Sequence, residues 1–253
     1  VRLSRAKYVA KVDAHTSYDQ GFDRKMLEFF AKWGDDITAV PVMRNLHAFN
    51  WKCHHCGWKK YQGPTPLECE KCKRTDKIQR QMIWEPRHGT YSTSYSFDQE
   101  PHFQYFEDWK HRPQYEKDKT EKRCTETMSL QGSLFMASRE KYWDLNLSDE
   151  SVGSWGNQGI ELACKTWLSG GRVLVNHDTW YAHMFRTQGG DFGFPYAQSG
   201  RGVDKTKHKV WEFFFNGKFK QQIHPVSWLV EKFWPVTGWD DSALRLLKER
   251  ESG

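Results

Sequence analysis

The sequence predicts an α/β fold that is interrupted by a small cysteine-rich insertion. Short apolar runs typical of strands alternate with amphipathic segments typical of helices, and residues 47–80 break this alternation with Lys, His and Cys. At 253 residues the chain is long enough to bury a substantial core. Aromatic residues reach 15% while apolar residues make up only 38%, so we expect large rings to fill much of that core.

The first forty residues predict a strand, a helix and a second strand. Residues 6–12 (AKYVAKV) form a short apolar run. A helix is expected next, capped by Thr16 or Ser17 and ended by Gly34, because apolar residues follow at helical spacing. Residues 37–43 (ITAVPVM) then predict the second strand.

The middle of the chain predicts loop, strand and helix. Residues 91–122 are polar and aromatic without a clear period, so irregular loop is expected there. Residues 133–137 (SLFMA) predict a strand. Residues 160–168 place apolar side chains at i, i+3, i+4, i+7 and i+8, and the glycines at 170–171 end the helix that this spacing predicts.

The last eighty residues predict two strands and two short helices. The strands are expected at residues 173–175 and 180–185, around an Asn-His-Asp turn. The helices are expected at residues 226–233 and 242–250, with Pro235 between them. No apolar run approaches the roughly 18 residues that span a membrane, and no signal peptide opens the chain, so the sequence predicts a soluble, cytoplasmic protein.

Two CxxC pairs form the strongest isolated motif. Cys53, Cys56, Cys69 and Cys72 supply four thiolates, which complete a closed tetrahedral site with no position left for a substrate. In a chain without export signals such pairs indicate metal rather than disulfides. The motif therefore predicts a structural Zn²⁺ that supplies the folding energy of a module too small to build its own core.

The insertion is also basic and aromatic. Its cations are Lys52, His54, His55, Lys59, Lys60, Lys71, Lys73, Arg74, Lys77 and Arg80, and its rings include Trp51, Trp58 and Tyr61. Cations that follow phosphates beside rings that stack on bases are typical of a nucleic-acid groove, and Trp84 is a further candidate to hold a base. The alternative is the ordinary solvated face of a basic zinc ribbon. The chain's net charge of +6 is compatible with phosphate-bearing ligands.

A second candidate metal site begins at the end of the first strand. Asp13 and His15 stand two residues apart, so strand alternation puts both side chains on one face, as a chelate requires. In open α/β sheets ligands gather beyond the carboxyl ends of strands, which is where both residues fall. The alternative is that the pair caps the following helix.

Several ordered motifs resemble one enzyme family. They are Asp13-Ala-His15, Ser133-Leu-Phe, Trp155-Gly followed by Glu161, Trp167, Gly170-Gly-Arg172 and His183-Met-Phe-Arg186. Over residues 4–43 and 132–196 the chain resembles the polypeptide N-acetylgalactosaminyltransferases and their relatives of the Rossmann-related GT-A fold. The resemblance implies that Asp13, His15 and His183 bind Mn²⁺ or Mg²⁺, which holds the diphosphate of a UDP-sugar donor.

The resemblance also implies a catalytic set of Trp155, Gln158, Glu161 and Arg186. Arg186 would pair with the diphosphate, and the glycine-rich loop 188–196 would close over the donor. Gln158 stands where the family has Glu and cannot act as a base, so retention of anomeric configuration is favoured. Glu161 has two open roles, one in catalysis and one in orienting a loop.

One departure from the family concerns the donor site. A GT-A domain has a nucleotide-binding half before its Asp-x-His motif, but only twelve residues precede Asp13 here. That half is expected to be truncated, supplied by a second chain or rebuilt. The predicted organisation is a catalytic domain in residues 1–46 and 81–200, a zinc ribbon in residues 47–80 and a C-terminal helical extension in residues 201–253.

The prediction for function is a metal-dependent glycosyltransferase that moves a sugar from a UDP-sugar to a hydroxyl. The acceptor favoured by the basic insertion is a hydroxymethylated base in DNA, as in modified viral genomes such as those of bacteriophages, which would place the protein in the host cytoplasm. Ser or Thr of a protein is the alternative acceptor that the resemblance implies. A nucleic-acid-binding zinc protein with a degenerate transferase domain, or a metal-dependent phosphoesterase, remain the other classes.

Overall fold

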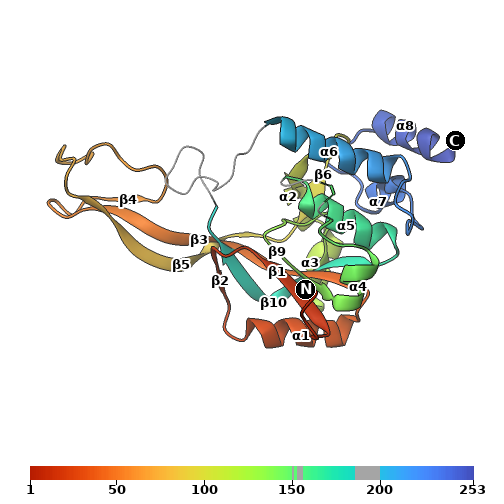
Figure 1. Ribbon diagram of the computed structural model, residues 1–253, viewed down its shortest axis with the longest axis horizontal. Helices are drawn as coiled ribbons and strands as arrows, with labels where there is room; N and C mark the ends of the chain where they lie inside the picture. Colours follow the sequence, from red (N-terminus) through yellow and green to blue (C-terminus); the bar gives the residue numbers. More distant parts are fainter. Residues whose placement is uncertain (150, 153–155, 186–199) are drawn as a thin grey trace.

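A computed structural model describes residues 1–149, 151–152, 156–185 and 200–253, and it has a mixed α/β architecture (Figure 1). Its main sheet has the order β1-β9-β3-β10-β2, with β4 and β5 paired to β3 and β8 paired to β10. The strands are β1 (Tyr8–Val12), β2 (Thr16–Tyr18), β3 (Ile37–Cys53), β4 (Lys59–Tyr61), β5 (Ile78–Ser92), β8 (Cys124–Glu126), β9 (Leu134–Ser138) and β10 (Arg172–His183). Strands β6 (Tyr95–Phe97) and β7 (Phe103–Tyr105) form a separate hairpin.

Helices cover both faces of the main sheet (Figure 1). The helices are α1 (Phe22–Trp33), α2 (Glu107–Lys110), α3 (Pro113–Glu121), α4 (Arg139–Asp144), α5 (Gln158–Leu168), α6 (Gly200–Phe215), α7 (Val226–Lys232) and α8 (Asp241–Ser252). Helix α1 packs Met26 and Phe30 on one face, while α5 and the C-terminal helices build the larger core on the other. None of the described helices is long and apolar enough to cross a membrane.

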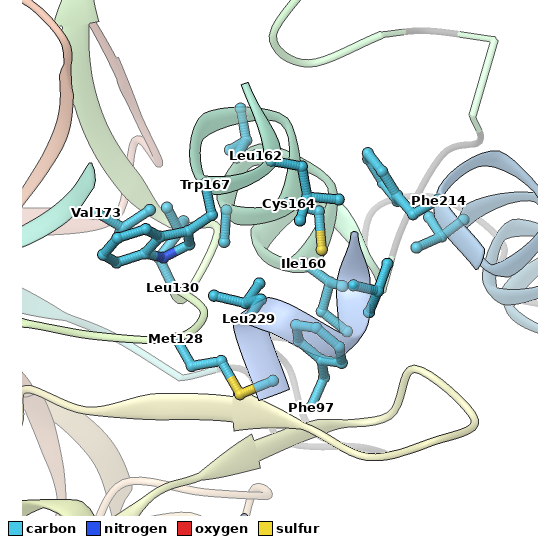
Figure 2. Close-up of a cluster of buried hydrophobic side chains, with 14 of the residues drawn as sticks. Phe97, Met128, Leu130, Ile160, Leu162, Cys164, Trp167, Val173, Phe214 and Leu229 are labelled. Atoms are coloured by element: carbon cyan, nitrogen blue, oxygen red, sulfur yellow. The ribbon is translucent and has the colours of Figure 1, made fainter. Parts of the chain in front are cut away.

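Helix α5 lies at the centre of the larger core (Figure 2). Every residue from Gly159 to Leu168 is buried, because the sheet, α6 and α7 surround the helix. Trp167 is the largest fully buried side chain, and its indole N–H donates to the Thr127 carbonyl at 3.1 Å. Leu229 of α7 and Phe214 of α6 pack in the same cluster, so the C-terminal helices are part of this core.

The helix cap predicted at Thr16 or Ser17 is wrong. Those residues form β2, which pairs with the end of β10, and α1 begins later at Phe22 behind Gly21, whose φ is +68°. The Thr16 hydroxyl donates to the Asp13 carbonyl at 2.8 Å instead of capping a helix. Strand pairing has therefore overridden a local capping preference. The predicted end of the helix at Gly34 is confirmed, with φ of +85°.

The irregular loop predicted for residues 91–122 is also wrong. The segment contains the end of β5, the β6–β7 hairpin and helices α2 and α3. Helix α3 buries only Tyr115 and is otherwise a polar surface helix, supported by ion pairs such as Lys122–Asp118 at 2.7 Å. A helix is predicted from apolar residues at helical spacing, and the sequence of α3 has almost no such spacing.

One further expectation differs from the structure, and two helices were not expected. The Asn-His-Asp segment is a bulge inside the single strand β10, in which Asn176 Oδ1 accepts from the Asp178 amide at 2.9 Å. The sequence also gave no expectation of α4 or α6, although α6 buries Val210 and Phe214. The strands expected at residues 6–12, 37–43 and 133–137 and the two last helices are confirmed within a few residues.

The cysteine-rich insertion extends from the main sheet as a ribbon. Strand β3 continues without a break from the sheet to Cys53, and β5 pairs with it from Ile78 to Ser92. Strand β4 adds a third strand near the tip of this projection (Figure 1). The boundary expected at residue 47 therefore falls inside a continuous strand, which connects the cysteine cluster to the centre of the fold.

Candidate metal centre

Three strands bring Asp13, His15 and His183 together. Asp13 follows β1, His15 precedes β2, and His183 is the last residue of β10. The Asp13 amide donates to the Ser133 carbonyl at 2.9 Å, and the Met184 amide donates to the His15 carbonyl at 3.1 Å. These backbone bonds fix a short turn against the end of β10, so residues separated by 170 positions in sequence share one site.

The three side chains converge as ligands of a divalent cation do. Nε2 of His183 lies 3.2 Å from Asp13 Oδ2, and Nε2 of His15 lies 3.9 Å from the same oxygen. Neighbouring ligands of an ion held at about 2.1 Å are roughly 3 Å apart, so the group needs little adjustment to close on a metal. The Nδ1 atom of His183 is buried and has no hydrogen-bond partner among the described residues. One carboxylate and two neutral imidazoles fit Mn²⁺ or a similar ion.

Lys11 fixes the orientation of the Asp13 carboxylate. Its Nζ lies 2.5 Å from Asp13 Oδ1 and donates to the Gly132 carbonyl at 2.7 Å. This leaves Oδ2 facing the two imidazoles. Burial raises the pKa of Asp13, but the hydrogen bond from His183 and the ion pair with Lys11 outweigh it and lower the pKa to about 2. The carboxylate is therefore ionised and ready to bind a cation at neutral pH.

A cavity of about 750 Å³ adjoins this centre. Lys11 and Asp13 line one part of it, the first turn of α5 lines another, and α6 lines a third with residues such as Val203 and Lys207. The volume is that of a site for a small organic ligand. His102 also lines the cavity, with Nδ1 at 2.9 Å from Asp98 Oδ2 and Nε2 at 3.0 Å from Lys207 Nζ.

Gln158 is placed at the cavity by a tight contact behind it. It is the first residue of α5, and its Nε2 donates to the Ser148 hydroxyl at 3.1 Å. A Cβ on the next residue, Gly159, would lie 1.7 Å from the Leu130 carbonyl oxygen. Glycine is therefore required there, because only a residue without a side chain lets the helix start approach the chain before β9 so closely.

Glu161 is buried and hydrogen-bonded to other groups of the protein. It is 3% exposed, and its Oε1 accepts from Lys165 Nζ at 2.7 Å and from the Asp149 amide at 3.0 Å. Lys165 also donates to the Asn146 carbonyl at 2.7 Å. Burial raises the pKa of Glu161, and the charge of Lys165 opposes that rise. Of its two predicted roles, the contacts favour orienting the loop at residues 146–149.

Two residues of the predicted catalytic set lie outside the described residues. They are Trp155 and Arg186, and the glycine-rich loop 188–196 lies outside them as well. Conversely, the structure adds Lys11, His102 and Ser148, which the motifs did not indicate. Lys11 has a weak sequence signal, since it lies in β1 two residues before Asp13, which directly follows that strand, and a period of two puts both side chains on one side. Asp98, His102 and Ser148 belong to turns whose position depends on tertiary packing.

The four predicted thiol ligands also lie together. Cys53 Sγ is 3.7 Å from Cys72 Sγ, and Cys56 Sγ is 3.5 Å from Cys69 Sγ. Tetrahedral thiolates at the usual Zn–S distance of about 2.3 Å are roughly 3.8 Å apart, whereas sulfurs of a disulfide are about 2.05 Å apart. The distances thus fit a metal and exclude disulfides between these pairs.

The two cysteine pairs have the same local geometry. In each, the amide four residues on donates to the carbonyl of the first cysteine, from Gly57 to Cys53 at 2.9 Å and from Lys73 to Cys69 at 2.8 Å. Both donors have positive φ, +73° and +61°. This turn aims both sulfurs of a pair inward, and the matched turns form a four-sulfur cage.

Comparisons with known proteins identify relatives over part of the chain. No family model matches. A 146-residue alignment is 24% identical to polypeptide N-acetylgalactosaminyltransferase 3 of Drosophila melanogaster and spans 47% of this chain but 21% of that protein. The human polypeptide N-acetylgalactosaminyltransferase 3 is 29% identical over 82 residues, which are 32% of this chain and 13% of the relative. The probable N-acetylgalactosaminyltransferase 9 of Caenorhabditis elegans is 29% identical over 80 residues, or 13% of its length.

A solved structure matches almost the whole chain. It is the crystal structure of GalNAc-T7 with UDP, GalNAc and Mn²⁺, with a TM-score of 0.55 and 17% sequence identity. The match covers 97% of this chain and 39% of that one. The chain therefore has the GT-A glycosyltransferase fold, and part of its sequence is homologous to N-acetylgalactosaminyltransferases.

Proposed function

We propose that the protein is a metal-dependent glycosyltransferase that moves a sugar from a UDP-sugar to a hydroxyl acceptor. The observation that carries the proposal is the convergence of Asp13, His15 and His183 beside a cavity of about 750 Å³. The GT-A fold and the partial homology support the same reaction class. GalNAc-T7 was crystallised with UDP, GalNAc and Mn²⁺, so UDP-GalNAc and manganese are the first donor and ion to test.

The residues around the cavity are proposed to have separate roles in such a reaction. Asp13, His15 and His183 would hold the divalent ion, which would neutralise the negative charge that builds on the leaving diphosphate. Lys11 keeps Asp13 oriented toward the imidazoles. Arg186 is proposed as a partner of the diphosphate. Trp155 is proposed to border the sugar, although its position lies outside the described residues.

Gln158 bears on the stereochemistry of transfer. Its side chain lines the cavity and is held by Ser148, so it can hydrogen-bond to a sugar or acceptor hydroxyl. An amide cannot remove a proton from that hydroxyl. Glu161 is engaged with Lys165 and the Asp149 amide, which leaves it poorly suited to act as a base. Transfer with retention of configuration is therefore proposed.

The acceptor proposed first is a Ser or Thr hydroxyl of a protein. Two of the aligned relatives are named polypeptide N-acetylgalactosaminyltransferases, and this supports a protein acceptor more directly than any other. A hydroxymethylated base in DNA is the second candidate, favoured by the concentration of positive charge on the ribbon. The third possibility is a degenerate, nucleic-acid-binding relative without transferase activity. The test must distinguish it from a transferase with either acceptor.

The cysteine cluster is proposed to hold one structural Zn²⁺. Four sulfurs in a closed cage leave no coordination position for a substrate. Backbone amides of Cys56 and His55 lower the pKa of Cys53 to about 7. The Arg74 amide lowers the pKa of Cys72, but burial and the three neighbouring sulfurs outweigh it and raise that pKa to about 12. Several thiolates so close together need a cation. All six cysteines are free, so we propose a reducing compartment such as the cytoplasm.

The uridine end of the donor site is the least complete part of the proposal. The aligned segments span only 13% to 21% of the three relatives named above, and the structural match covers 39% of GalNAc-T7. A second chain that supplies the nucleotide-binding half, or a donor site rebuilt from residues of this chain, is proposed to complete the nucleotide site.

A direct test measures UDP release. The protein is incubated with Mn²⁺ and each of a panel of UDP-sugars, first without an acceptor and then with Ser/Thr peptides, hydroxymethylated DNA and unmodified DNA. Manganese-dependent release that a peptide or modified DNA accelerates supports the transferase and identifies its acceptor. No release with any donor, from protein that binds both Zn²⁺ and Mn²⁺, supports the degenerate relative instead.

A further inference from the structure

The positive charge of the chain is concentrated on the ribbon. Residues 47–92 contain nine Lys and Arg and four Asp and Glu, a net charge of +5, whereas the other 207 residues contribute only +1 to the total of +6. Three of the four acidic residues pair with Lys60, Lys73 and Lys77. In the part of the chain that the structure describes, Lys52, Lys59 and Lys71 form no ion pair with an acidic side chain. The transferase reaction does not account for this concentration of charge.

One face of the ribbon is apolar and covered. Phe49 and Trp51 are 1% and 5% exposed, and the Arg80 guanidinium lies over both rings at 5.4 and 5.0 Å from their centroids. Lys60 lies directly opposite Trp51 in the pairing of β3 and β4 and so shares that face. This face is already occupied by the protein's own side chains.

The opposite face is polar, with Lys59, Tyr61 and Gln79 exposed on it, and is called here the basic face. The strand register places Asn50 beside Tyr61 and Gln81, and Lys52 beside Lys59 and Gln79. Successive residues of a strand alternate between faces, so these six side chains share one surface. His47 and Arg87 join them, with the His47 ring 4.8 Å and the Arg87 guanidinium 5.2 Å from the Tyr61 ring centroid.

The pairing of Lys52 with Lys59 is the central observation. Like charges directly opposite each other in an antiparallel pair are destabilising, and no acidic side chain among the described residues offsets this pair. An anionic ligand would remove that repulsion. Tyr61 is 43% exposed two residues further along, and its ring is oriented by His47 and Arg87.

We propose that the basic face binds single-stranded nucleic acid. Lys52 and Lys59 would contact phosphates, the Tyr61 ring would stack on a base, and the amides of Asn50 and Gln79 would offer hydrogen-bonding groups to base edges. A strand surface with an exposed, oriented ring suits a splayed single strand better than a duplex, whose bases are already stacked. An acidic peptide would satisfy the two lysines but would leave the ring and the amides without a role.

The strand that carries the basic face also leads to the metal centre. Asn45 of β3 pairs with His183, and Lys52 follows seven residues later in the same strand, roughly 23 Å away. A strand bound on the ribbon could therefore reach the cavity over several nucleotides. This connection rests on the proposed function and bears only on its second acceptor candidate, DNA, whereas binding by the basic face does not depend on catalysis.

The test is fluorescence polarisation with labelled 12-nucleotide single-stranded DNA and RNA, the matching duplex and an acidic peptide, at two salt concentrations. The K52A/K59A variant is expected to bind single strands more weakly. The slope of log binding constant against log salt concentration is expected to become shallower by roughly 0.7 for each lost phosphate contact. Tyr61→Ala is expected to weaken binding about 5- to 150-fold, and Tyr61→Phe is expected to restore it. K60A/K73A is the matched control with paired lysines.

Three results would overturn the proposal. They are unchanged binding in K52A/K59A and Tyr61→Ala, an equal loss in K60A/K73A, and a preference for duplex or acidic peptide over single strands. Zinc content and circular dichroism of each variant show whether the ribbon has kept its fold. UDP release measured on the same preparations separates a failure of this proposal from a failure of the proposed transferase.

Discussion

Lys11 and Asp13 form an ion pair at the edge of the metal centre, with Lys11 Nζ 2.5 Å from Asp13 Oδ1, and this pair directs the other carboxylate oxygen at His183 and His15. Lys11 also links β1 to the segment before β9, because its Nζ donates to the Gly132 carbonyl. The orientation of one metal ligand thus depends on Lys11 of β1 and, through it, on the Gly132 carbonyl, which is 121 residues from Lys11 in sequence.

The first prediction concerns the pH dependence of stability in metal-free protein. The folded pKa of Asp13 is about 2, below its ordinary value of 3.8, so its contribution is present above about pH 4 and is lost as the pH falls toward 2. That contribution is at most about 2 kcal/mol, and less after solvent screening. Asp13→Asn should flatten the change in unfolding free energy over this interval. Urea unfolding in EDTA at pH 2 to 5 measures the unfolding free energy of both proteins. Identical pH profiles for wild type and Asp13→Asn would contradict the contacts assigned to Asp13.

The second prediction concerns Gly159. Its substitution by Ala should destabilise the protein by about 1–3 kcal/mol or more, because the new Cβ would lie 1.7 Å from the Leu130 carbonyl oxygen and the backbone would have to move. Gly89→Ala is the matched control, since nothing lies within 4 Å of the added atom. Denaturant unfolding of both variants checks the prediction. Equal stabilities would show that α5 does not approach residues 130–132 as described.

The third prediction separates the two roles of Glu161. Glu161→Gln should cost up to about 3–5 kcal/mol of unfolding free energy, because Lys165, which is 1% exposed, would lose its ion pair at 2.7 Å and keep only the one with Asp149 at 3.9 Å. The double variant E161L/K165M should recover much of that stability. A Glu161→Gln protein as stable as wild type, but without turnover, would assign Glu161 to catalysis instead.

The fourth prediction concerns zinc removal. Cys69→Ser should abolish binding of one Zn²⁺ per chain and unfold residues 50–75 locally, while the core around α5 stays folded. Hydrogen exchange should show lost protection in β4 and the outer part of β3, with little change in α5. Cys164→Ala is the control, because Cys164 is buried outside the cluster. Wild-type protein that folds fully without zinc would contradict the proposal.

Much of the fold could be predicted because its elements have strong local patterns. Helix α5 repeats apolar residues at helical spacing, and the CxxC pairs specify their own turns. The failures have physical causes. Thr16 and Ser17 are good caps in isolation, but pairing with β10 outweighs that preference. Helix α3 buries a single ring, so its sequence has no apolar period.

The candidate site shows the same division. Asp13, His15 and His183 could be grouped from their motifs, and the structure places their ligand atoms within 4.8 Å of one another. The sequence motifs could not place three other residues at the cavity, namely Lys11, Ser148 and His102. Their relation to the cavity arises from packing between distant segments. The predicted acceptor remains a prediction, since it depends on a ligand rather than on a local pattern. Roles for Trp155 and Arg186 likewise stay predictions.

The fifth prediction tests the central claim most directly. His183→Ala should fold normally but lose manganese affinity, because it removes one of three ligands, and manganese-dependent UDP release should fall by more than roughly tenfold. His111→Ala, which changes an exposed histidine outside the site, should behave as wild type. Electron paramagnetic resonance of added Mn²⁺ and UDP release at limiting Mn²⁺ are measured on the same samples. Parallel loss of both in His183→Ala alone is the predicted result, and wild-type release by His183→Ala at limiting manganese would contradict the account.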